Sequence, residues 1–128
     1  MQDIEVLGTP GSPYTRKMTA LLRYRRIAHR TIWGSHFDPP SGYPPPKVKL
    51  LPTFYFPTAE GKEAMVDSTP IIQRLEAEHS GRNVLPEDPL LGFLDRLIED
   101  FADEWLTKAM FHYRWHFPRD ADQAAQIL

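Results

Sequence analysis

The feature that most constrains this chain is the passage from a short apolar segment into a helix at residues 11–17, which read GSPYTRK. An apolar segment with β-branched residues precedes this motif at residues 3–8, and apolar residues at helical spacing follow it. Ser12 suits the N-cap, because its hydroxyl can accept a hydrogen bond from a backbone N–H of the first turn. Pro13 suits the first helical position, where no N–H is needed. The motif therefore predicts a strand over 3–8 and a helix over 13–26.

Ser12 has a structural and a chemical interpretation. Capping alone explains a serine at the start of a helix. A hydroxyl at the positive end of a helix dipole can also stabilise an anion, such as a thiolate or a phosphate. Both interpretations stay open at this point, and Ser12 is a candidate site residue.

The pattern continues as an α/β domain. Further elements are predicted as strands over 29–33, 50–56 and 64–66 and a helix between Thr69 and Gly81. Five prolines within residues 34–49 exclude a regular helix there and predict a loop. The order β-α-β-β-β-α is typical of an α/β domain on a small mixed sheet.

The remainder of the chain is predicted to be helical. A polar residue followed by proline at Asp88 and Pro89 starts a long helix, which runs to Phe117 and is stopped by Pro118. Its expected core face consists of Leu90, Leu94, Leu97, Ile98, Phe101, Trp105, Ala109 and Tyr113. A further helix starts near residue 120. We therefore expect residues 90–128 to be the truncated start of a helical domain, in which the apolar face lacks its later cover.

Composition excludes several classes of function. The chain has no cysteine, which excludes disulfides, zinc–thiolate clusters and a protein thiol as nucleophile. The formal net charge is −2 and no basic stripe is present, so no nucleic-acid partner is expected. No apolar run reaches the roughly 18 residues of a membrane span, and the N-terminus lacks the pattern of a signal peptide. We expect no membrane partner and a cytoplasmic location.

Two other chemistries have weaker support. His112 and His116 lie one helical turn apart, but no acid or cysteine stands at a known ligand spacing, so solvated or packing histidines are expected and no metal site. Ser12 lies in no Gly-x-Ser-x-Gly elbow, and no histidine is placed by sequence as its base. Acyl transfer by this serine is therefore not expected.

The order and spacing of the motifs resemble the thioredoxin-like N-terminal domain of glutathione transferases. The resemblance covers residues 4–85, and the helix after Asp88 is similar to the first helix of the family's C-terminal domain. It implies a glutathione-binding domain over 1–82, a linker over 83–89 and a helical domain from residue 90. The motifs that carry it are residues 11–17, Leu51-Pro52 and Asp67-Ser68.

By this resemblance Ser12 is the catalytic residue, matching the serine or cysteine that faces the glutathione sulfur. Classes that use tyrosine carry it at the end of the first strand, where this chain has Leu7 and Gly8, so Ser12 is favoured over Tyr14. A hydrogen bond to a charged partner contributes roughly 1.5–3 kcal/mol. One pKa unit corresponds to about 1.4 kcal/mol, so the hydroxyl could lower a thiol pKa of about 8.5 to near neutrality.

The resemblance also implies contacts that hold the peptide. Leu51, before a family cis-proline at Pro52, would pair its backbone with the cysteinyl part of glutathione. Ser68 would hold the γ-glutamyl carboxylate at a helix start, next to Asp67, which stands where the family often has glutamate or glutamine. Lys49, or its neighbour at position 47, would meet the glycine carboxylate.

The implied function is a glutathione transferase that activates the glutathione thiol for attack on a small electrophile. Glutathione is the implied co-substrate, and the exposed apolar helix predicts a homodimer or another self-association. The alternative is a non-catalytic transferase-like domain that serves protein–protein contact. Because cysteine is absent, disulfide reductase activity and a mixed disulfide with glutathione are not expected.

Overall fold

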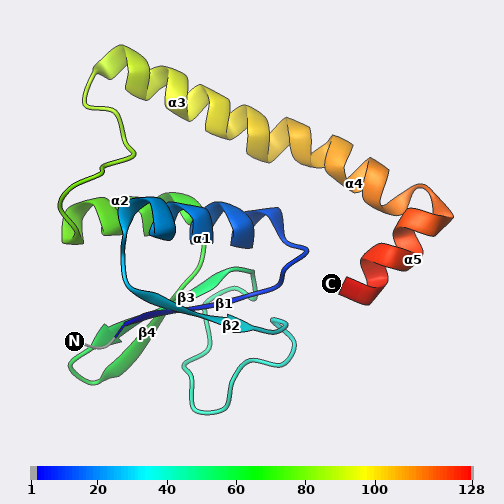
Figure 1. Ribbon diagram of the computed structural model, residues 1–128, viewed down its shortest axis with the longest axis horizontal. Coiled ribbons are helices and arrows are strands. Elements are labelled where there is room, and N and C mark those ends of the chain that lie inside the picture. The colour runs from blue at the N-terminus through cyan, green and yellow to red at the C-terminus, as the bar shows by residue number, and fades with distance from the viewer. Residues whose placement is uncertain (1–2, 128) are drawn as a thin grey trace. The chain divides into compact units, whose positions relative to one another are not determined.

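The computed structural model describes residues 3–127, which divide into two compact units (Figure 1). One unit ends at Arg82 and the other spans Asn83–Ile127. The elements of the first unit are β1 (Ile4–Gly8), α1 (Pro13–Arg25), β2 (His29–Trp33), β3 (Thr53–Thr58), β4 (Gly61–Met65) and α2 (Ser68–Glu78). The predicted β-α-β-β-β-α order of a thioredoxin-like α/β domain is confirmed.

The four strands form one mixed sheet in the order β2-β1-β3-β4. β1 runs parallel to β2 and antiparallel to β3, and β3 and β4 form an antiparallel hairpin. Leu7 of β1 pairs with Ile32 on one side and Thr53 on the other. All five residues of β1 are buried, as expected for a strand with neighbours on both sides.

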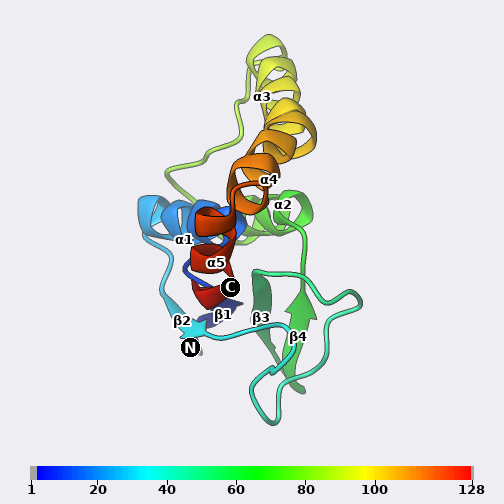
Figure 2. The same cartoon turned by 90° about the vertical axis from the view of Figure 1, so that its right-hand side faces the viewer.

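The two faces of the sheet are covered differently. Val6 and its partner Phe54 are fully buried, and Phe56 follows Phe54 on the same face because side chains alternate along a strand. The Arg74 guanidinium of α2 lies 3.9 Å from the centre of the Phe56 ring, which places this face under the helices. Figures 1 and 2 show α1 and α2 on one side of the sheet and the loop between β2 and β3 on the other.

Two strands begin at different residues from those predicted. β3 starts at Thr53 instead of Leu50, because Pro52 has no N–H to donate to a strand ladder. β4 starts at Gly61 instead of Ala64, since the hairpin pairing continues to the turn. Gly61 has a φ of +138°, a conformation that side-chain-bearing residues rarely adopt.

The second unit is entirely helical. It contains α3 (Pro89–Phe101), a π-helical segment η1 (Ala102–Leu106), α4 (Thr107–Trp115) and α5 (Pro118–Ile127). The predicted long helix thus ends at Trp115 instead of Phe117 and contains a π segment that the periodicity did not indicate. The Asp88 carboxylate accepts from the backbone N–H groups of Leu90 and Leu91 at 3.0 and 2.9 Å, so the predicted start is confirmed.

The apolar stripe predicted on the long helix is present, but within residues 3–127 it is not buried. None of the residues in α3, η1 or α4 is buried, and all eight predicted core positions are exposed. The physical reason is that a helix buries its apolar stripe only against a second layer, and this unit offers one long helix followed by a short one. Within residues 3–127, no helix is both long enough and apolar enough to cross a bilayer.

Candidate functional site

Ser12 lies between the end of β1 and the first turn of α1. Its backbone N–H donates to the Thr9 carbonyl at 3.1 Å, and its hydroxyl oxygen accepts from the Thr15 N–H at 3.2 Å. The predicted cap is therefore present, and the Ser12 side chain is buried. Capping uses a lone pair of the oxygen, and the hydroxyl proton can be donated to another group. One residue can thus start the helix and also donate to an anion.

The close approach of α1 to β1 explains why the strand ends in glycine. A Cβ atom on Gly8 would lie 2.4 Å from Cγ2 and 2.7 Å from Oγ1 of Thr15. Thr15 is fully buried, so it has little room to move away. A tyrosine at this strand end would push α1 off the sheet.

Leu51 and Pro52 lie beside the same end of the sheet. Their peptide bond is cis, and Pro52 is buried. Thr53 follows directly and pairs with Leu7, so the Leu51 backbone lies next to the chain that leaves β1. The Thr53 hydroxyl donates to the Leu50 carbonyl at 2.8 Å and ties this segment to β3.

At the start of α2, the Ser68 hydroxyl meets the ammonium of Lys17. Asp67 is the N-cap of α2, accepting from the Thr69 N–H at 3.2 Å, and Ser68 is the first helical residue. The Lys17 ammonium, from α1, donates to the Ser68 hydroxyl at 3.1 Å. Asp67 has a φ of +76°, a strained conformation that costs about 1–3 kcal/mol and clusters at ligand clamps. A hydroxyl, an ammonium and a helix N-terminus therefore meet at one point.

Lys17 was missed by the sequence analysis. The contact joins residues 51 positions apart, so no local pattern reports it. The available signal was a cation near the N-terminus of a helix, which the dipole disfavours unless a negative group is close by.

The two lysines predicted for the glycine end of glutathione lie on the loop between β2 and β3. Lys47 and Lys49 are both exposed. Within residues 3–127, neither makes an ion pair or hydrogen bond to Ser12, Leu51 or Ser68. The structure therefore brings Ser12 and Leu51 to one edge of the sheet and Lys17 to Ser68.

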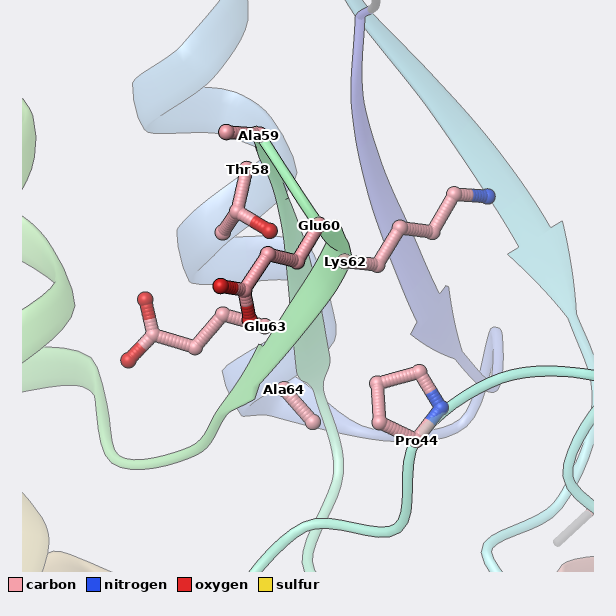
Figure 3. A pocket seen from close by; sticks show the side chains of 7 residues that line it. All are labelled: Pro44, Thr58, Ala59, Glu60, Lys62, Glu63 and Ala64. Carbon is pink, nitrogen blue, oxygen red and sulfur yellow. The ribbon is translucent and has the colours of Figure 1, made fainter.

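A shallow hollow of about 600 Å³ lies elsewhere, at the turn of the β3–β4 hairpin (Figure 3). The residues around it are Pro44, Thr58, Ala59, Glu60, Lys62, Glu63 and Ala64. Thr58 pairs with Gly61 at this turn, whereas the Leu7–Thr53 pair lies toward the other end of β3. The hollow is therefore separate from the edge that carries Ser12.

The described residues contain no cluster of three or more His, Asp or Glu side chains placed to hold a metal ion. The rings of His112 and His116 stack on each other with centres 4.6 Å apart. Stacking on the same helix face is a packing arrangement that a pair of histidines one turn apart readily adopts.

Comparisons with known proteins add three observations. Residues 6–83 match the family model for the N-terminal domain of glutathione S-transferases. Among solved structures, a glutathione S-transferase from Methylobacterium radiotolerans, in complex with glutathione sulfonate, has a TM-score of 0.66 at 24% identity, over 80% of this chain and 47% of that chain. No curated protein sequence matches the chain.

Two further solved structures have the same fold. A glutathione S-transferase from Rhodospirillum rubrum has a TM-score of 0.67 at 15% identity, over 87% of this chain and 51% of that chain. Glutathione transferase Omega 1C from Trametes versicolor has a TM-score of 0.69 at 15% identity, over 98% of this chain and 58% of that chain. The present chain thus spans about half the length of the structures it matches, and at such identities the likeness shows the fold.

Proposed function

Because this chain belongs to the glutathione S-transferase family, we propose that it binds glutathione and activates its thiol for attack on a small electrophile. The observation that supports the proposal is the position of the Ser12 hydroxyl at the positive end of α1. Its oxygen caps the helix, so its proton can be donated to an anion there. The matched structure from M. radiotolerans, which holds glutathione sulfonate, supports glutathione as the ligand class.

In the proposed mechanism the Ser12 hydroxyl donates a hydrogen bond to the glutathione sulfur. This bond and the helix N-terminus stabilise the thiolate over the thiol, so the thiol proton leaves to solvent near neutral pH. The thiolate then forms a carbon–sulfur bond to the electrophile, and the electron pair moves to the leaving group or to the activated atom. No covalent bond to the protein is formed.

The other proposed site residues suit the charged groups of glutathione, which are two carboxylates and an ammonium. Leu51 offers its backbone to the cysteinyl part of glutathione, while Ser68 and Lys17 together offer a hydroxyl and an ammonium to the γ-glutamyl carboxylate. Asp67 supplies the negative charge that the γ-glutamyl amino group needs. Lys49, or Lys47, meets the glycine carboxylate. Hydrogen bonds between charged partners of this kind contribute roughly 1.5–3 kcal/mol each.

Calorimetric titration of the chain with glutathione tests this proposal. We expect saturable binding at millimolar concentration or below, and weaker binding of a glutathione whose γ-glutamyl carboxylate is removed. Absence of binding at millimolar glutathione would favour the non-catalytic alternative.

The exposed apolar face of the long helix supports self-association, which is compatible with either function. Leu97 is 53% exposed and Ile98 67%, and a large exposed apolar surface marks an interaction site. On this basis the chain associates with a second copy through this face. Light scattering of the chain should show a dimer that Leu97→Glu disrupts and the neighbouring Arg96→Glu does not. A monomer at high micromolar concentration, with the helix intact by circular dichroism, would contradict self-association.

A further inference from the structure

A buried carboxylate lies on the face of the sheet opposite the helices. Glu5, in the central strand β1, is only 7% exposed. Its carboxylate accepts hydrogen bonds from Arg30 of β2 and Lys62 of β4, and from the Tyr43 hydroxyl at 2.9 Å. Arg30 and Lys62 lie on strands at opposite edges of the sheet. We call Glu5, Arg30, Tyr43 and Lys62 the Glu5 cluster.

Tyr43 is the member of the Glu5 cluster that comes from outside the sheet. Its hydroxyl accepts from the Arg30 guanidinium at 3.0 Å and donates to Glu5, so both hydrogen-bonding roles of the hydroxyl are used. Its ring meets the buried Tyr55 ring edge-on, with centres 4.7 Å apart, and the Lys62 ammonium lies 3.9 Å from its centre. Figure 3 shows the Lys62 side chain extending from β4 over β1. Tyr43 is therefore held by all four strands.

The segment that Tyr43 holds is the long loop between β2 and β3. The loop has no helix or strand over residues 34–52, and loops of this length are uncommon unless they are functional. At its start, the Gly34 N–H donates to the Gly8 carbonyl at 3.0 Å. At its end, the Leu50 carbonyl accepts from Thr53. Tyr43 thus forms an attachment in the middle of a loop whose two ends lie at the edge that carries Ser12.

We propose that Tyr43 is a positioning residue, which fixes this loop and thereby sets the affinity of the site for the glycine end of glutathione. The inference rests on the proposed function. The effect is entropic. With Tyr43 fixed, only the short segment that carries Lys47 and Lys49 must be ordered when the ligand binds, whereas without this attachment the whole loop must be ordered. Leu51 depends less on this attachment, since the Leu50–Thr53 hydrogen bond and the pairing of β3 hold it independently.

The test compares two ligands on two variants of the 128-residue chain. Tyr43→Phe keeps the ring and removes the hydrogen bonds to Glu5 and Arg30. Tyr24→Phe, at a 52% exposed position on α1, is the matched control. The ligands are glutathione and γ-glutamylcysteine, which lacks the glycine. We expect Tyr43→Phe to raise the Kd for glutathione about tenfold and that for γ-glutamylcysteine less than about twofold. Tyr24→Phe should change neither.

A second measurement reports the order of the loop without a ligand. Amide hydrogen exchange within residues 34–50 should become about tenfold faster in Tyr43→Phe and stay unchanged in Tyr24→Phe. If Tyr43→Phe weakened the binding of both ligands equally, or left the ratio of their Kd values unchanged, the positioning role would be overturned. The proposed function would stand in either case, because the unchanged chain would still bind glutathione. If the unchanged chain bound neither ligand, the proposed function would fail, and the inference with it.

Discussion

The two units of this chain use apolar residues in opposite ways. In the first unit, every residue of β1 is buried and α1 and α2 each bury a stripe, whereas no residue of α3, η1 or α4 is buried. The difference lies in the number of layers, since a sheet with helices on one face encloses a core and a long helix followed by a short one does not. All of the candidate glutathione contacts lie in the unit that has a core.

The largest expected effect comes from testing this difference in burial directly. Phe54→Ala removes a fully buried ring from the sheet and should lower the free energy of unfolding by about 3–5 kcal/mol. Phe93→Ala removes a ring that is 61% exposed on α3 and should change the free energy of unfolding by less than about 0.5 kcal/mol. Urea denaturation of both variants measures these values. Comparable losses would mean that the helical unit has a core of its own.

The next effect concerns the charge buried in the first unit. Burial alone would raise the pKa of Glu5, but hydrogen bonds from Lys62, Arg30 and Tyr43 lower it from 4.5 to about 2. A carboxyl whose pKa is lower in the folded state stabilises the fold above its unfolded pKa. This contribution, about 3 kcal/mol, is lost as the pH falls from about 4.5 toward 2.

Stability measured between pH 7 and pH 2 checks the role of Glu5. Glu5→Gln should be less stable than the unchanged chain at neutral pH, and the difference should shrink through the acid range. The matched control is Glu60→Gln, at an exposed position of the hairpin turn. An acid profile of Glu5→Gln that runs parallel to that of the unchanged chain would contradict the assignment.

A smaller effect is expected on the affinity of the first unit for glutathione. Lys17→Met removes the ammonium that donates to Ser68 and should weaken glutathione binding about tenfold, while Lys17→Arg should retain most of the affinity. Arg16→Met, at the exposed neighbouring position, controls for the general loss of positive charge. Calorimetry measures all three variants. If Arg16→Met weakened binding as much as Lys17→Met, the specific contact would be rejected.

Features fixed by neighbouring residues could be predicted from the sequence. The strand at His29–Trp33 and the cap at Ser12 depend on local alternation and on a side chain that bonds three residues ahead. The proline-rich loop follows from the fixed φ of proline and its missing N–H. Such features need no knowledge of the rest of the fold.

Features that join distant segments could not be predicted in this way. A glutamate in a strand pattern indicates a solvent-facing position, yet Glu5 is buried because Arg30, Tyr43 and Lys62 converge on it from three other segments. The contact between Lys17 and Ser68 likewise exists only once α1 and α2 lie together. The sequence predicts the apolar stripe of α3, but whether a stripe is buried depends on a partner layer.

The proposed mechanism requires Ser12 to donate a hydrogen bond to the glutathione sulfur, and the thiol pKa of bound glutathione tests this directly. It can be followed by the ultraviolet absorbance of the thiolate as a function of pH, in the unchanged chain and in two variants. Ser12→Ala removes the hydroxyl, and Ser12→Asp keeps a capping oxygen for the Thr15 N–H but has no proton to donate. We predict a pKa at least about one unit below the usual value of about 8.5 in the unchanged chain, and a return toward that value in both variants. The same thiol pKa in all three proteins would contradict this role of Ser12 and leave it as a helix cap alone.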